Sequence, residues 1–202
     1  MFGFFRRRRT LERMLSDLAA CGIAPRAGVS PEAMLKNAGM DRREIEKGDF
    51  AALLIALGIE DYDEQTPETP RTWSDDVWHF DTECIAGDGD YVRIVRHLSR
   101  LARGALRFAS VRDHVDIGAG VAWVETADGS GTERLALRVD DDWVDEAIFA
   151  FLQSRLVAAG ARPRFAAHGL GQDMLLVCLE PRAIARLNRV TGLRFQEFPS
   201  RP

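Results

Sequence analysis

The chain has few cysteines and no long uninterrupted run of apolar residues. Its longest apolar stretch, Phe50 to Ile59, contains Gly58 and is much shorter than the roughly 20 residues of a transmembrane helix. The basic run Arg6–Arg9 is followed by charged residues and not by the apolar core of a signal peptide. The cysteines are far apart and odd in number, as is typical of reduced thiols: Cys21, Cys84 and Cys178. We therefore expect a cytoplasmic protein that does not contact a membrane.

No large excess of one charge is present either. The 202 residues carry 27 Lys and Arg against 31 Asp and Glu, a formal net charge of −4. This mild acidity, without a recurring basic and aromatic pattern, argues against nucleic acid as a partner, and we interpret Arg6–Arg9 as a solvated run. What the chain does have is 46% apolar residues, enough to bury a core and to exclude wholesale disorder.

The charge is distributed unevenly, and the unevenness predicts a domain organisation. The net charge is +3 over residues 1–58, −6 over residues 59–76 and −1 over residues 77–202. The acidic middle segment also contains Pro67 and Pro70, as linkers often do. We therefore predict an N-terminal helical region at 1–58, an acidic linker at 59–76 and a larger domain at 77–202.

Periodicity and capping residues predict short helices in the N-terminal region. Apolar residues at helical spacing follow Thr10 and end before Gly22, which indicates a first helix. Ser30, Asp41 and Asp49 are placed as N-caps of three further helices. Four helices of this size bury little surface alone, so we expect them to pack onto the larger region.

The region from 77 to 202 alternates between strand and helix signals. Strands are expected near 77–82, 114–117, 121–126, 135–139, 164–167, 174–179 and 193–198, and helices near 91–103, 144–157 and 181–191. We expect Asp140–Asp142 to cap the second of these helices. Most of the strands are joined by short turns. The order favours an α+β fold with an antiparallel or mixed sheet and helices on one face, rather than a doubly wound parallel sheet.

Carboxylates are the side chains that carry the functional hypotheses. They fall into three groups, namely Asp81, Glu83, Asp88 and Asp90; Asp113 and Asp116 on either side of His114; and Asp140, Asp141, Asp142 and Asp145 around Trp143. Each group can bond to backbone N–H groups in turns and caps, bind a hard cation, or form a charged surface for a basic partner. His114 is the best candidate for a general base, because carboxylates beside it favour its protonated form.

Motifs for other chemistries are missing from the sequence. It has no HExxH pair, no EF-hand loop, no G-x-S-x-G elbow and no phosphate loop. We therefore predict no cofactor and no defined set of metal ligands.

Several short stretches support a resemblance to a protein family. They are His79-Phe-Asp-Thr-Glu-Cys-Ile85, Gly89-Asp-Tyr91, Arg112-Asp-His-Val-Asp-Ile117, Val121-Ala-Trp123, Asp141-Asp-Trp-Val-Asp145, Gly171-Gln-Asp173 and Thr191-Gly-Leu-Arg-Phe195. With these stretches the chain resembles a group of uncharacterised bacterial cytosolic α+β proteins, similar to immunity proteins encoded near secreted polymorphic toxins. The resemblance implies binding to another protein and assigns no role to any residue.

Two functional hypotheses follow. The first is a non-catalytic protein-binding module, of the immunity type, that occludes a basic protein through Asp113, Asp116, Asp141, Asp142, Trp143 and Asp145. The alternative is a metal-dependent hydrolase or nucleotide-processing enzyme that uses Asp81, Glu83, Asp88, Asp90 and His114.

Overall fold

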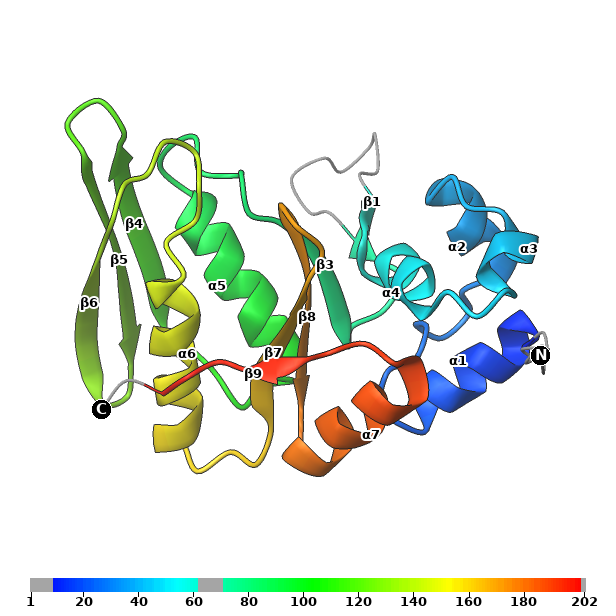
Figure 1. The fold of residues 1–202 in the computed structure, drawn as a ribbon. Coiled ribbons are helices and arrows are strands. Elements are labelled where there is room, and N and C mark those ends of the chain that lie inside the picture. The colour runs from blue at the N-terminus through cyan, green and yellow to red at the C-terminus, as the bar shows by residue number, and fades with distance from the viewer. Residues whose placement is uncertain (1–8, 62–70, 201–202) are drawn as a thin grey trace, which may run out of the picture. The chain divides into compact units, whose positions relative to one another are not determined.

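The structure is a computed structural model that describes residues 9–61 and 71–200 (Figure 1). Its helices are α1 (Leu11–Ala19), α2 (Pro31–Asn37), α3 (Arg42–Ile45), α4 (Phe50–Gly58), α5 (Asp90–Leu101), α6 (Ala147–Ala158) and α7 (Pro181–Thr191). Its strands are β1 (Glu60–Asp61), β2 (Arg71–Thr72), β3 (Val77–Asp81), β4 (Ser110–Asp116), β5 (Val121–Asp128), β6 (Gly131–Leu137), β7 (Arg164–Gly169), β8 (Asp173–Leu179) and β9 (Gln196–Glu197). The α+β expectation is confirmed, and from β3 onward helices and strands follow the expected order.

The strands form two main sheets. One has the order β3-β8-β7-β9, the other has the order β4-β5-β6, and β1 pairs with β2 in a separate two-stranded ribbon. Within the described residues every pairing with an assigned register is antiparallel. Strands β4, β5 and β6 follow one another through short turns, as do β7 and β8, which is the connection that antiparallel neighbours allow.

Several elements differ from the sequence-based expectation. Strands β1 and β2 fall in the predicted linker, where no strand was expected, and β4 and β6 begin earlier than expected. The last strand is only Gln196–Glu197, because the side-chain amide of Asn188 bonds to both backbone groups of Phe195, at 2.8 and 3.0 Å. Helix α6 begins at Ala147, and Asp140–Asp142 do not cap it. Instead, Asp145 Oδ1 accepts a hydrogen bond from Ala147 N at 3.0 Å.

The chain divides into two compact units. The first unit comprises the described residues up to His79 together with Arg182–Phe195, and the second comprises Phe80–Pro181 and the described residues from Gln196. This division assigns α7 to the unit of the N-terminal helices. The predicted boundaries at 58 and 76 remain a prediction, and residues 62–70 of the predicted linker lie outside the described residues.

The N-terminal helices begin where their capping residues predict. The side chains of Ser30, Asp41 and Asp49 each accept a backbone hydrogen bond from the first turn of α2, α3 and α4. Helix α4 is apolar on nearly all sides and contacts α2 and α3, so it forms the centre of the first unit's core.

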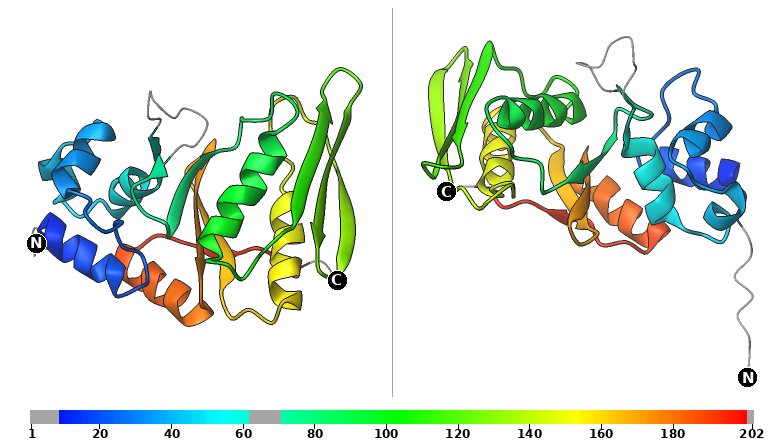
Figure 2. Two further views of the ribbon diagram at one scale, coloured as in Figure 1. Left: turned by 180° about the vertical axis from the view of Figure 1, so that it is seen from behind. Right: turned by 90° about the horizontal axis from the view of Figure 1, so that it is seen from above.

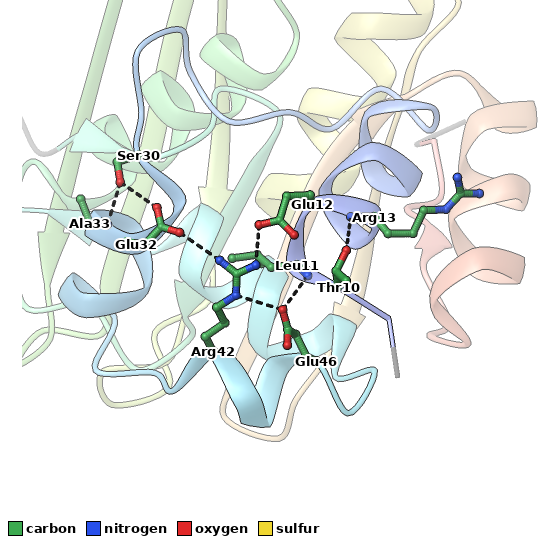
Figure 3. A network of polar contacts seen from close by, with 9 residues as sticks. All are labelled: Thr10, Leu11, Glu12, Arg13, Ser30, Glu32, Ala33, Arg42 and Glu46. Atoms are coloured by element: carbon green, nitrogen blue, oxygen red, sulfur yellow. Dashed lines mark hydrogen bonds and ion pairs between the residues drawn. The ribbon is translucent and has the colours of Figure 1, made fainter. Parts of the chain in front are cut away.

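Arg42 connects three helices of the first unit (Figure 3). Its guanidinium donates to Glu12 on α1 at 2.5 Å, to Glu32 on α2 at 3.0 Å and to Glu46 at 2.9 Å. Glu46 in turn accepts a hydrogen bond from Leu11 N at 3.1 Å, at the start of α1. One side chain therefore fixes short helices that have little buried surface of their own.

The last residues of the predicted linker are ordered in the first unit. Ser74 is fully buried, and its hydroxyl donates to Ala24 O at 2.7 Å. Asp76 Oδ2 accepts from Ala24 N at 3.0 Å, and Asp75 forms an ion pair with Arg26 at 2.5 Å. These contacts attach residues 74–76 to the loop between α1 and α2.

In the second unit, α5 and α6 lie between the β4-β5-β6 sheet and strands β7 and β8 (Figure 2). Helix α6 is buried at Ile148, Phe149, Phe151, Leu152, Gln153 and Leu156, as expected for a helix with a layer on either side. Each helix therefore covers one face of each sheet. Among residues 9–61 and 71–200, no helix combines the length and the apolar character that crossing a bilayer requires.

The β4-β5-β6 sheet has one buried and one exposed face. On β5, Ala122, Val124 and Thr126 are buried, while Trp123 and Glu125 are partly exposed on the opposite face. On that outer face Glu125 bonds to Arg112 and Arg134, and the Arg134 guanidinium lies 3.9 Å from the centre of the Trp123 ring. These cross-strand contacts add to the stability of the pairing between the three strands.

Candidate functional site

Two of the predicted acidic groups meet in the second unit. Residues 82–85 run antiparallel to residues 142–144, with Val144 N donating to Thr82 O at 2.8 Å and Ile85 N donating to Asp142 O at 2.9 Å. This bridge places Glu83 directly opposite Trp143. Because opposite residues of an antiparallel pair lie on the same face, Glu83 and Trp143 share one face of this bridge.

A turn between β7 and β8 joins the same place. Gln172 O accepts a hydrogen bond from Thr82 N at 3.1 Å, and Gln172 Nε2 donates to Glu83 Oε2 at 2.5 Å and to Asp81 Oδ1 at 3.4 Å. Gln172 was not among the predicted site residues. Its position could not be read from the sequence, because the side chain reaches carboxylates about ninety residues away.

We call Asp81, Glu83, Asp141, Asp142 and Trp143 the acidic surface. Partial desolvation raises the pKa of the Glu83 carboxyl above its usual value, and three neighbouring carboxylates raise it further: Asp142, Asp81 and Asp141. Trp143 is 40% exposed, which is unusual for so large an apolar side chain. The acidic surface therefore combines concentrated negative charge with an aromatic ring that is accessible to solvent.

A backbone turn places Asp141 and Asp142 on the surface of the second unit. Trp143 N donates to Asp140 O at 3.0 Å, which closes a turn with Asp141 at φ 53°. Aspartate tolerates this left-handed conformation better than most side chains. Asp141 and Asp142 are both exposed.

The other residues predicted to bind a partner make local contacts. Both oxygens of Asp145 accept backbone hydrogen bonds, from Arg138 N at 2.7 Å and from Ala147 N at 3.0 Å. Asp116 Oδ1 accepts from Ala119 N at 2.8 Å in the β4–β5 turn. Asp113 accepts two backbone hydrogen bonds at the start of α5. Their part in partner binding stays a prediction. In the structure each of these carboxylates accepts backbone hydrogen bonds and so stabilises a turn or the start of a helix.

The residues of the alternative hypothesis are divided among three places. Asp81 and Glu83 belong to the acidic surface, whereas Asp88 Oδ1 lies 3.1 Å from His114 Nδ1 and accepts a hydrogen bond from Val115 N at 2.6 Å. Asp90 Oδ2 accepts from the backbone N–H groups of Ala86 and Gly87, and so closes the loop before α5. Within the part of the chain that the structure describes, no group of three or more His, Cys, Asp or Glu side chains is placed to hold a metal ion.

Comparison of the chain with protein-family models, with curated proteins and with solved structures gave no match.

Proposed function

We propose that this chain is a non-catalytic protein-binding module that takes a basic partner on its acidic surface. The observation that carries the proposal is the position of Trp143, an exposed indole that lies directly opposite Glu83 and next to further carboxylates. Aromatic residues are enriched among the residues that dominate binding energy at protein interfaces. Carboxylates around such a residue raise the association rate with a positively charged partner and select against acidic ones.

The resemblance to immunity proteins suggests a specific form of this function. In that form the partner is a toxin, and binding occludes the toxin's basic surface. We also propose that the chain is cytoplasmic. Its three cysteines form no disulfide in the structure, and thiols stay reduced in that compartment.

A capture experiment with matched variants tests the proposal. The wild-type chain is compared with Asp141→Asn/Asp142→Asn/Trp143→Ala as bait in native lysate, and bound proteins are identified by mass spectrometry. We expect the wild type to retain a basic protein whose capture weakens as salt is added, because screening reduces the attraction between charges. The triple variant should lose it.

The control is Glu180→Gln/Glu197→Gln, which removes two exposed negative charges of the second unit outside the acidic surface. The control should capture the same protein as the wild type. If the triple variant captures the same proteins as the wild type, the acidic surface is not the binding site.

A further inference from the structure

The first unit contains a cavity of about 350 Å³ with a cationic lining. It lies between the end of α7 and the turn that joins α3 to α4. Among the described residues that line it, the charged ones are all cations: Arg9, Lys47 and Arg189. Phe50 and Val190 add apolar surface. A cavity lined in this way is unexpected in a chain whose net charge is −4.

The three cations can donate further hydrogen bonds to a ligand. Among the described residues, Arg9 has long polar contacts, 3.8 Å to an oxygen of Asp17 and 3.5 Å to Val190 O, although its guanidinium has five N–H donors. Lys47 is paired with Glu44 at 2.6 Å but keeps 60% of its side chain exposed. Arg189 is exposed and makes no hydrogen bond or ion pair with another residue of 9–61 or 71–200. Neither Asp17 nor Glu44 lines the cavity.

The charge and the size of the cavity define the ligand. Like charges that converge repel one another, so an anion bound among them lowers the electrostatic energy. Helix α7 ends here at Thr191, and a helix C-terminus carries partial negative charge, so side chains and not helix N–H groups must hold the anion. A phosphate group carries a charge between about −1.5 and −2 at neutral pH and has three acceptor oxygens, which suits an arginine fork beside a lysine.

The lining also has a small apolar part, which suits an organic group on the ligand. It comes from the half-buried Val190 and from the small exposed part of Phe50, whose ring centre lies 5.5 Å from the Arg9 guanidinium. An apolar wall beside a cationic one is typical of sites for small organic anions. A volume of about 350 Å³ is at the lower end of the range for small-molecule sites, so the cavity suits a small ligand.

We infer that this cavity binds a small organic phosphate, with Arg9, Lys47 and Arg189 on the phosphate and Phe50 and Val190 beside the organic group. None of these residues belongs to the acidic surface. The inference therefore stands or falls independently of the proposed protein-binding function.

Calorimetric titration of the full chain at low ionic strength tests the inference, with phenyl phosphate and inorganic phosphate as probes. We expect saturable binding of phenyl phosphate, with a higher affinity than inorganic phosphate. In Lys47→Gln/Arg189→Gln the affinity should fall by at least about tenfold, since two charge-assisted contacts are lost. Both side chains are exposed, so the variant should fold.

The matched control is Arg43→Gln/Arg186→Gln. It also removes one cation from α3 or its end and one from α7, but neither residue lines the cavity. The control should bind phenyl phosphate within about twofold of the wild type, the change expected when only a screened, distant charge is lost. Three results would overturn the inference: no saturable binding of either probe, equal affinity for both probes, or equal weakening in the two double variants.

Discussion

Asp113 on β4 caps helix α5 at Gly89, a residue that lies 24 positions earlier in the chain. Its Oδ1 accepts a hydrogen bond from Gly89 N at 2.8 Å, and its Oδ2 accepts one from Val92 N at 3.1 Å. Gly89 occupies the N-cap position with φ 103° and has no side chain with which to cap the helix itself. A carboxylate at the N-terminus of a helix also interacts favourably with the helix dipole.

Loss of this carboxylate should destabilise the second unit. We expect Asp113→Ala to lower the free energy of unfolding by about 1 kcal/mol, the usual cost of removing a capping side chain. Asp113→Asn keeps one acceptor oxygen and should lose less. Urea denaturation followed by circular dichroism measures both, with Glu197→Ala as an exposed control. An unchanged midpoint for Asp113→Ala would show that the cap contributes nothing.

Gly58, at the end of α4, should not tolerate a larger side chain. A Cβ atom at this position would lie 2.6 Å from His79 N and 3.0 Å from the carbonyl carbon of Trp78, which is backbone and cannot move aside alone. We expect Gly58→Ala to destabilise the protein by about 2–3 kcal/mol, in the range of overpacked cores. Gly169→Ala is the matched control, since a Cβ there meets nothing within 4 Å. Thermal denaturation should separate the two variants clearly, and equal melting temperatures would contradict the close approach.

Local signals were sufficient for most of the fold. Ser30, Asp41 and Asp49 predicted three helix starts because a cap bonds to its own first turn. The end of the chain was harder to predict. Phe195 lies in a stretch with strand character, but Asn188 takes its backbone hydrogen bonds, and that competition is invisible in a local pattern.

The candidate sites depend on pairings that no local pattern specifies. Glu83 and Trp143 are sixty residues apart, and nothing in either segment indicates that they form a bridge. The cationic cavity likewise needs α7 beside the α3–α4 turn, which brings Arg189 to Lys47. The net positive charge of residues 1–58 predicted a basic region there, and Arg9 and Lys47 belong to it. The third cation of the cavity, Arg189, comes from a distant part of the chain and could not be predicted in this way.

The ion pairs of Arg42 should make the stability of the protein depend on pH. Backbone N–H groups make the largest contribution to lowering the pKa values of Glu12 and Glu46, that of Glu12 itself for Glu12 and that of Leu11 for Glu46, and hydrogen bonds from the Arg42 guanidinium lower both further. A carboxyl with a lowered folded pKa stabilises the protein above its unfolded pKa, about 4.3 for Glu, and this stabilisation is lost as the pH falls through the folded value. Arg42→Ala should therefore be less stable than wild type at pH 7, and the difference should narrow below about pH 4.

Urea midpoints at several pH values measure this difference. Because Arg42 is partly exposed, we expect a smaller loss than for Gly58→Ala and a weaker effect in high salt. Arg43→Ala, next to it but exposed, is the control. A difference that stays constant from pH 7 to pH 3 would be inconsistent with the ion pairs as its source.

The change of stability with pH that we expect from Glu83 is opposite to that expected from Glu12 and Glu46. Its pKa is raised, first by desolvation and then by the carboxylates around it, so the folded state binds a proton more tightly than the unfolded chain. The charged form therefore costs stability at neutral pH, and that cost disappears as the pH falls through the raised pKa toward the unfolded value. Glu83→Gln keeps an acceptor oxygen and removes the charge, so we expect it to melt at or above the wild-type temperature at pH 7 and to lose this advantage in mild acid.

The same substitution should weaken capture of a basic partner at pH 7, because it removes charge from the acidic surface beside Trp143. Stability and binding would then change in opposite directions, as expected when like charges are held together for a partner and not for the fold. Melting curves from pH 4 to pH 7, read with capture at pH 7, distinguish this from a structural role. The prediction is wrong if the Glu83→Gln variant is less stable than the wild type and still captures the partner. Glu83 would then stabilise the backbone bridge to Trp143 and would not be part of a binding surface.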